Sequence, residues 1–322
     1  MSPPSFSRSA VTISARAPGP RFRTSASRAD NGTTITGNTP AGTAGLANAV
    51  VTTAGGTVTG GFTYVKATKL VVGYWTVATD GGVFAFGQAR FNGSMGGRHL
   101  NKPVVGLAPT PDGNGYWLVA SDGGIFNAGD AKFFGSMGNT HLNKPVVGLA
   151  PTSDGNGYWL VASDGGIFNA GDAKFFGSTG GNPLNSPIVG MAATPDGQGY
   201  WLVAADGGVF SFGDSKFYGS MGAQKLVKPI VGIAPTGDGR GYWLDASDGG
   251  VFAFGDAKFY GSQGGRPLNA PMVGMSSTPD GGGYWTDATD GGIFTYGDAS
   301  FFGSMGGRPL NAPMVGMATY AQ

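Results

Sequence analysis

The sequence of 322 residues lacks three features, and each absence excludes a class of chemistry or structure. It has no cysteine, which excludes disulfides, thiol catalysis and cysteine-based zinc sites. It has no glutamate, so all 19 acidic residues are aspartate. No apolar run approaches the roughly 20 residues that a membrane-spanning helix needs. We therefore expect no transmembrane segment.

Charged residues are also sparse, at 12% of the chain, and the net charge is +1. The basic excess lies in the first 30 residues, whereas acidic residues outnumber basic ones from Lys66 onward. Domains that bind nucleic acids present a basic surface that neutralises phosphates. We therefore expect no nucleic-acid partner.

Glycine and proline are abundant, with 62 and 20 residues, and they divide the chain into short segments. The six tryptophans recur every 42 residues, each within the tripeptide GYW. They are Trp75, Trp117, Trp159, Trp201, Trp243 and Trp285. A fixed period of this length indicates either a β-propeller or a solenoid.

One repeat, from Val104 to Pro145, contains four apolar segments, which read VVGLAPT, GYWLVAS, GGIFNAG and AKFFGS. They are separated by PDGNG, SDGG and GD, whose Asp and Gly residues favour tight hairpin turns. The repeat therefore predicts a four-stranded antiparallel blade, followed by the linker MGNTHLNKP. The GYW strand is apolar on both faces, which predicts burial on both faces and a core role for the tryptophans.

The two ends of the repeat region distinguish a propeller from a solenoid. The region begins at Gly73 with a second strand and ends with a first strand, PMVGMATY, over residues 313–320. A solenoid needs polar caps at both ends, and none is visible. We therefore predict an all-β, six-bladed β-propeller of four-stranded antiparallel blades, closed by pairing of the C-terminal first strand with the N-terminal second strand.

The repeat resembles two kinds of known sequence. Its first two strands resemble WD-repeat and NHL-repeat blades, although the WD dipeptide and the structural histidine of WD repeats are missing. Over residues 73–320 the repeat is similar to the tandem GYWLVASDGGVFAFGDA repeats of secreted and cell-wall-associated actinobacterial proteins. That resemblance implies an accessory role and a secreted or cell-surface location. No signal peptide is visible, because SAVTISA is too short and polar for its apolar region.

A different resemblance concerns residues 31–65, NGTTITGNTPAGTAGLANAVVTTAGGTVTGGFTYV. This stretch looks like the C-terminal half of an IPT/TIG domain, an immunoglobulin-like sandwich, and its runs TTIT, AVVTT and FTYV suit strands. Residues 1–30 are rich in Arg and Ser without an apolar core. We therefore expect a disordered segment at 1–30, a partial IPT/TIG-like β fragment at 31–65 and the propeller at 66–322.

Catalytic motifs are not evident. Thr278, Asp280, Gly282 and Trp285 match the Asp-box of sialidase-like propellers, which is a folding device, and sialidase chemistry also needs a glutamate and an arginine triad. The histidines, His99 and His141, lie one repeat apart and lack metal-ligand spacing. We expect no catalytic residue, metal or cofactor, with Ca²⁺ left open where Asp carboxylates cluster.

Two residues depart from the repeat in a way that suggests a site. Asp245 and Asp287 stand in second strands where the other repeats have valine, and a buried carboxylate is costly unless it is paired, hydrated or bound to an ion. We therefore hypothesise a polar pocket between the fifth and sixth blades for a sugar or a cation. With polar residues of the linkers, the candidate ligand-binding residues are Asp245, Asp287, Arg98, His99, Arg266, Asn269, Arg308 and Asn311.

Three functions remain open from the sequence. The first is a non-catalytic module that binds polysaccharide or a cell-envelope glycan through the face carrying the SDGG turns and linkers. Weak polar contacts repeated round a ring would act there through avidity. The second is a protein-interaction scaffold, and the third is a hydrolase or lyase with an Asp-based site. We expect a monomer.

Overall fold

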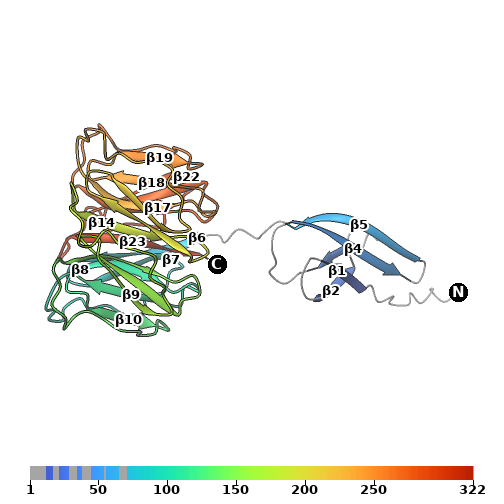
Figure 1. The fold of residues 1–322 in the computed structure, drawn as a ribbon. Helices are drawn as coiled ribbons and strands as arrows, with labels where there is room; N and C mark the ends of the chain where they lie inside the picture. The colour runs from blue at the N-terminus through green and yellow to red at the C-terminus, as the bar shows by residue number, and fades with distance from the viewer. Residues whose placement is uncertain are drawn as a thin grey trace. The chain divides into compact units, whose positions relative to one another are not determined.

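The computed structural model describes residues 12–16, 22–28, 35–37, 45–53, 56–64 and 71–321. The chain divides into two compact units, Met1–Thr68 and Lys69–Gln322, and each is described by itself (Figure 1). All described regular elements are β-strands. The described residues contain no helix that could span a membrane.

The N-terminal unit contains one antiparallel sheet in the order β3-β2-β1-β4-β5. Its strands are β1 (Thr12–Arg16), β2 (Phe22–Arg28), β3 (Ile35–Gly37), β4 (Gly45–Thr53) and β5 (Gly56–Tyr64). The strands expected around TTIT, AVVTT and FTYV are therefore present. Strands β1 and β2 lie within the segment 1–30 that was expected to be disordered, and β1 pairs with both β2 and β4. The predicted domain boundaries stay a prediction.

The second unit contains six three-stranded antiparallel sheets, which we number in the order of their tryptophans. The first strands are β23 (Met314–Ala321), β8 (Val104–Pro109), β11 (Val146–Pro151), β14 (Ile188–Ala193), β17 (Ile230–Pro235) and β20 (Met272–Ser277). The second strands are β6 (Val71–Ala78), β9 (Gly115–Ala120), β12 (Gly157–Ala162), β15 (Gly199–Ala204), β18 (Gly241–Ala246) and β21 (Gly283–Ala288). The third strands are β7 (Val83–Gly87), β10 (Ile125–Gly129), β13 (Ile167–Gly171), β16 (Val209–Gly213), β19 (Val251–Gly255) and β22 (Ile293–Gly297).

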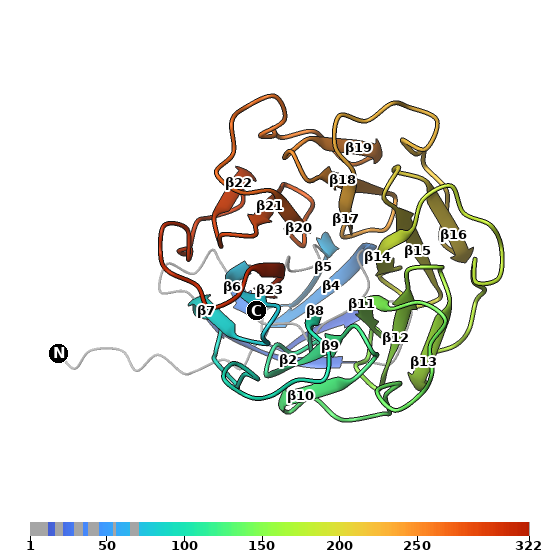
Figure 2. The same cartoon turned by 90° about the vertical axis from the view of Figure 1, so that its left-hand side faces the viewer.

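These sheets are arranged round a common axis like the blades of a propeller (Figure 2). The first strands lie innermost, where each contacts the first strands of its two neighbours. The second strands β9, β12, β15, β18 and β21 are buried at every position, as the apolar pattern on both parities predicts.

The first sheet combines the two ends of the repeat region. Strand β23 pairs antiparallel with β6, in a register that places Met314 opposite Ala78 and Ala318 opposite Trp75. The predicted pairing of the C-terminal first strand with the N-terminal second strand is thus confirmed. Residues far apart in sequence therefore share one β-ladder.

The prediction of a fourth strand in each blade is wrong. In the second sheet the expected segment, residues 131–136, has no ladder, and side chains bond its backbone instead. The indole of Trp117 donates to the carbonyl of Lys132 at 2.7 Å, and the amide of Phe134 donates to the hydroxyl of Tyr158 at 3.1 Å. We call this segment, residues 131–136, and its equivalents in the other sheets the strap. Positive φ angles of 66° at Gly129 and 138° at Gly135 turn the chain near its two ends.

The GYW tyrosine and tryptophan join neighbouring sheets. The Tyr158 hydroxyl donates to the carbonyl of Gly135 in the preceding sheet's strap at 2.6 Å. The Trp117 and Tyr158 rings pack with centroids 5.7 Å apart, within the preferred range for tilted aromatic pairs. Equivalent tyrosine bonds occur six times among the described residues. The repeat thus packs by burying its largest side chains between sheets.

Candidate functional site

The turn between first and second strands accounts for one of the three repeated aspartate positions. In the second sheet, the Thr110 hydroxyl donates to the carboxylate of Asp112 at 2.8 Å, and the Asp112 carboxylate accepts from the amide of Asn114. These bonds hold the pKa of Asp112 down at about 2, whereas burial raises the pKa of Asp130, which lies beside the same hydroxyl.

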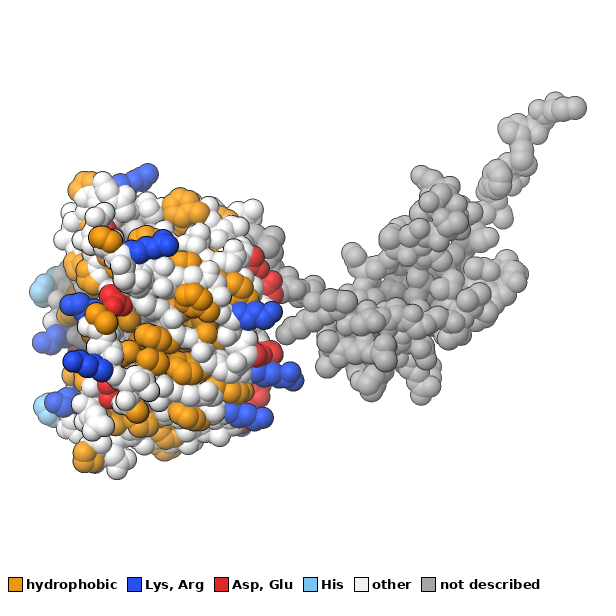
Figure 3. Space-filling model, turned by 90° about the horizontal axis from the view of Figure 1, so that it is seen from above, with side chains coloured by type: hydrophobic (Ala, Val, Ile, Leu, Met, Phe, Trp, Pro, Cys, Tyr) orange, Lys and Arg blue, Asp and Glu red, His pale blue; other side chains and the backbone are white. Residues whose placement is uncertain are grey.

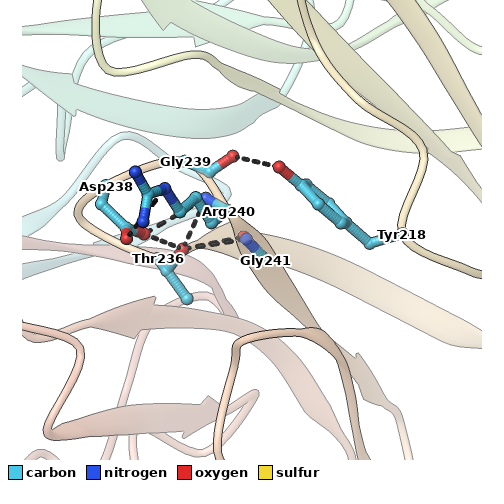
Figure 4. Close-up of polar contacts among 6 residues, drawn as sticks. All are labelled: Tyr218, Thr236, Asp238, Gly239, Arg240 and Gly241. Atoms are coloured by element: carbon cyan, nitrogen blue, oxygen red, sulfur yellow. Dashed lines mark hydrogen bonds and ion pairs between the residues drawn. The ribbon is translucent and has the colours of Figure 1, made fainter.

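The same turn in the fifth sheet is tied to its neighbour. Figure 4 shows the Thr236 hydroxyl at the centre of the turn, beside Asp238, while Tyr218 donates to the carbonyl of Gly239 at 3.1 Å. Arg240 and Asp238 form an exposed ion pair at 3.8 Å, which adds little to stability.

The Asp-box residues themselves lie in the sixth sheet. There the amide of Gly282 donates to the carboxylate of Asp280, and the amide of Gly283 donates to the hydroxyl of Thr278. The Asp-box resemblance is therefore accounted for as turn chemistry.

Asp245 and Asp287, predicted as ligand-binding residues, are both 0% exposed. Gly232 lies opposite Asp245 in the fifth sheet, and Gly274 lies opposite Asp287 in the sixth. The carboxylates of both aspartates have no hydrogen-bond partner among the described residues. Burial raises the pKa of Asp245 to about 7. Burial, and then the charge of Asp245, raise the pKa of Asp287 well above its usual value.

Neither aspartate lines any of four hollows found in the described part of this unit. A sugar ring therefore cannot reach these carboxylates in this structure, which argues against the sugar part of the predicted interblade pocket. The cation part of that hypothesis is compatible with full burial.

The other predicted residues are exposed and lie on three linkers: Arg98 and His99, Arg266 and Asn269, and Arg308 and Asn311. The SDGG turns and linkers do meet on one face, since the Met95 amide donates to the carbonyl of Gly81. However, the structure does not gather the six residues into one hollow. Of these six residues, His99 alone lines one of the same four hollows.

The hollow around His99 has a volume of about 320 Å³. It lies between the linker that joins the first and second sheets and the strap of the second sheet. Its lining includes Asn101, Asp122, Phe133 and Asn139. Phe133 is 58% exposed, so one ring face is available to a ligand beside amide, carboxylate and imidazole groups. Phe133 was not among the residues predicted from the sequence, because AKFFGS was assigned to the fourth strand of the blade.

Equivalent phenylalanines occur in all six straps, and each is 58–60% exposed. They are Phe91, Phe133, Phe175, Phe217, Phe259 and Phe301. Figure 3 shows hydrophobic side chains distributed over the wall of this unit, with Lys and Arg side chains among them. Exposed aromatic side chains spaced by the repeat can contact an extended or repetitive ligand at several points.

A larger cavity of about 470 Å³ opens on the axis, at the end where the first strands meet the PDG-type turns. All six first strands contribute to its lining. Most of the wall is apolar, with Leu149, Met191 and Ile233, while Ser276, Ser277 and Thr319 supply hydroxyls on one side. No titratable side chain lines it, so the cavity suits holding a ligand through shape and hydroxyl contacts.

The sequence analysis placed binding on the opposite, linker face and did not identify this axial cavity. The available signal was the run VVGLAPT with its counterparts, whose ends include Ser276 and Ser277. The cavity itself depends on the six first strands lying innermost, which the sequence does not show.

Six antiparallel sheets with their first strands round one axis define the β-propeller class of architecture, here with three strands per sheet. No protein-family model matches the chain, and no curated protein matches it. A structural genomics protein of unknown function from Bacteroides thetaiotaomicron is similar at 14% identity and a TM-score of 0.46, with 89% of this chain and 90% of that chain covered.

A second solved structure is the β-propeller domain of Myceliophteria thermophila Cps50 (Swd1). It is similar at 8% identity and a TM-score of 0.49, with 85% of this chain and 96% of that chain covered. Because both TM-scores are below 0.5, the fold assignment rests on the strand pairing of this chain.

Proposed function

We propose that residues 69–322 form a closed six-bladed β-propeller that acts as a non-catalytic binding module. The hollow at His99 and Phe133 is the single observation that carries this proposal. Contacts between the two ends of the repeat region, which we call the seam, support closure. Strand β23 pairs with β6, and the amide of Met314 donates to the carbonyl of Thr289. The same type of bond joins the other first strands to the preceding sheets, as from Val146 to Ser121.

The ligand class that we propose is polysaccharide or a cell-envelope glycan. An exposed aromatic face next to amide, carboxylate and imidazole groups matches the needs of a sugar, which presents apolar C–H surfaces and a rim of hydroxyls. The hollow combines Phe133 with Asn101, Asp122 and Asn139 in this way. A secreted or cell-surface location is part of the proposal and is supported by the sequence resemblance alone.

A glycan array with the purified full-length protein tests this function. We expect saturable binding to at least one repetitive polysaccharide and weaker binding to its short oligosaccharides, because avidity is lost when only one contact can form. Absence of binding to every polysaccharide on the array would refute the carbohydrate assignment.

The axial cavity favours a second candidate, a protein-interaction scaffold. Its apolar wall of Leu149, Met191, Ile233 and Met275 can bury an apolar side chain of a protein or peptide, and Ser276 and Ser277 can bond its backbone. Replacement of the half-buried Ser276, which lines this cavity, by Phe would fill part of it. Loss of a protein partner with unchanged polysaccharide binding would favour the scaffold. An Asp-based hydrolase or lyase remains the third hypothesis, tested by product release from the glycans that bind.

A further inference from the structure

The interface between the fifth and sixth sheets differs in polarity from four of the other five interfaces. At those four, a valine of one sheet and a leucine of the next belong to the same apolar cluster. The pairs are Val77 with Leu118, Val119 with Leu160, Val161 with Leu202, and Val203 with Leu244. In the fifth and sixth sheets, Asp245 takes the valine position and Thr286 takes the leucine position. A polar residue therefore replaces an apolar one on both sides of this interface.

Two more polar exchanges occur at the same interface. Tyr296 stands where the other repeats have Phe or Ala, and Gln263 stands where they have Met or Thr. Tyr296 packs against the cluster that contains Trp243 of the fifth sheet. Burial raises the pKa of Tyr296, whereas hydrogen bonding with the side chains of Gln263 and Thr286 and the positive charge of Arg266 act to lower it. Four oxygen-bearing side chains thus belong to one interface.

The oxygens of three of these side chains are buried and unsatisfied. The two carboxylate oxygens of Asp245 have no hydrogen-bond partner among the described residues. The hydroxyls of Thr286 and Tyr296 lie close to each other, but neither forms a hydrogen bond of good geometry within the described part of the chain. Asp245 is 0% exposed and Thr286 is 1% exposed. Buried polar groups in native proteins are almost always satisfied, so this interface requires a further polar or charged species.

We propose that Asp245, Thr286 and Tyr296 form an enclosed site for one hard metal cation of the Na⁺ or Ca²⁺ type. Carboxylate, hydroxyl and amide oxygens are the ligands that such cations prefer. A cation also neutralises the carboxylate in a region where an unpaired charge is strongly disfavoured. Gln263, which lies next to Tyr296, supplies a further oxygen at the outer side. The leucine-to-threonine exchange removes apolar volume where the ion would lie.

The interface between the sixth and first sheets carries a partial version of the same exchange. Asp287 replaces the valine and Thr76 replaces the leucine, and the oxygens of both side chains are again buried without a partner. The positions equivalent to Tyr296 and Gln263 are Phe86 and Met305, which supply no oxygen. This interface therefore serves as a comparison with two of the four exchanges.

A proton is the competing neutralising species for Asp245. The two explanations predict different effects of metal ions on Tm at constant ionic strength. Thermal unfolding of the full-length protein is followed at about pH 8 and about pH 5 in tetramethylammonium chloride, which is progressively replaced by NaCl or, separately, by CaCl₂. We expect a saturable rise in Tm of about 2–4 °C at pH 8 with at least one metal ion, because ligand binding stabilises only the folded state. The rise should be smaller at pH 5, where protons compete.

Variants locate the response. The double variant D245V/T286L restores the pair found at the four apolar interfaces, so we expect it to fold and to lose the metal-dependent rise. T76L makes the matching leucine change at the neighbouring interface and leaves Asp287, whose charge interacts with that of Asp245, in place. We expect T76L to retain the rise. The proposal is overturned if the wild-type Tm follows pH but not the identity of the cation. An equal metal-dependent rise in D245V/T286L would overturn it as well.

Discussion

The hydroxyl of Tyr74 donates to the carbonyl of Gly303 at 2.5 Å, across 229 residues of sequence. The Phe302 amide donates to the same hydroxyl at 3.2 Å. These contacts place the first repeat's tyrosine on the last repeat's strap, as Tyr158 is placed on the strap that ends at Gly135. The seam between the two ends of the repeat region thus uses the same contacts as an interface between successive repeats.

The substitution Tyr74→Phe tests this seam. It removes one donor and one acceptor from a partly buried strap, so we expect the free energy of unfolding to fall by about 1–3 kcal/mol. Tyr158→Phe makes the same change within the chain and is the matched control. Urea unfolding should give a similar loss for both variants. A loss for Tyr158→Phe with none for Tyr74→Phe would show that the seam is open in solution.

The buried carboxyl of Asp245 predicts a stability that falls as pH rises, in buffers without metal cations. Its folded-state pKa of about 7 lies above the usual value of 3.8, so the folded state retains the proton while the unfolded state loses it. Stability from this group is complete below about pH 4 and is lost between about pH 4 and pH 7. The loss is on the order of 4 kcal/mol, at about 1.4 kcal/mol per pH unit.

The variant D245V/T286L should remove most of that pH dependence, as measured by urea unfolding at about pH 4.5 and pH 8. Asp287 remains in this variant and keeps a part of the dependence, since its pKa is also raised by burial. If the slope in D245V/T286L equals that of the wild type, Asp245 is not the group that titrates.

Core packing predicts a large loss of stability for any GYW tryptophan. Trp201 is 0% exposed, its ring packs against Tyr242 at 5.8 Å, and its indole donates to the carbonyl of Lys216. Trp201→Ala leaves a cavity and an unbonded carbonyl, so we expect a loss of about 3–5 kcal/mol in thermal or urea unfolding. Trp201→Phe should lose less. Polysaccharide binding by folded Trp201→Phe should be unchanged, and reduced binding would instead indicate a direct role in the site.

Removal of the Phe133 ring should weaken glycan binding specifically. Its ring is exposed beside His99, so Phe133→Ala should weaken binding about tenfold, equivalent to about 1.4 kcal/mol, without a matching loss of stability. The exposed Val227, on a different linker, gives the control Val227→Ala. Calorimetric titration with a polysaccharide identified on the array measures both. Equal affinity of the two variants would exclude the Phe133 hollow as the site.

The repeat period and the turn chemistry were sufficient to predict much of the fold. The 42-residue spacing of tryptophan, the Asp-Gly turns and the incomplete repeats at either end predicted three of the strands in each sheet and the pairing of β23 with β6. The prediction of a fourth strand was wrong because the apolar residues of AKFFGS follow a pattern that is typical of strands. Only the folded chain shows that Trp117 and Tyr158 take the backbone bonds that a ladder would have used.

The candidate sites were less predictable. Asp245 and Asp287 stood out in the sequence as departures from valine, but their complete burial and the matching threonines, Thr286 and Thr76, depend on which sheets face each other. The exposed Phe133 and the axial cavity likewise have no local signature, because exposure is a property of the assembled sheets.

The sequence by itself determined the repeat, the strands and turns, and the absence of cysteine and glutamate chemistry, because those depend on residue type and local spacing. Only the tertiary structure decided which side chains meet. The contact of Tyr74 with Gly303 and the position of Asp245 and Thr286 at one interface arise when sheets pack round a common axis. That packing brings together residues whose separation in sequence carries no local signal.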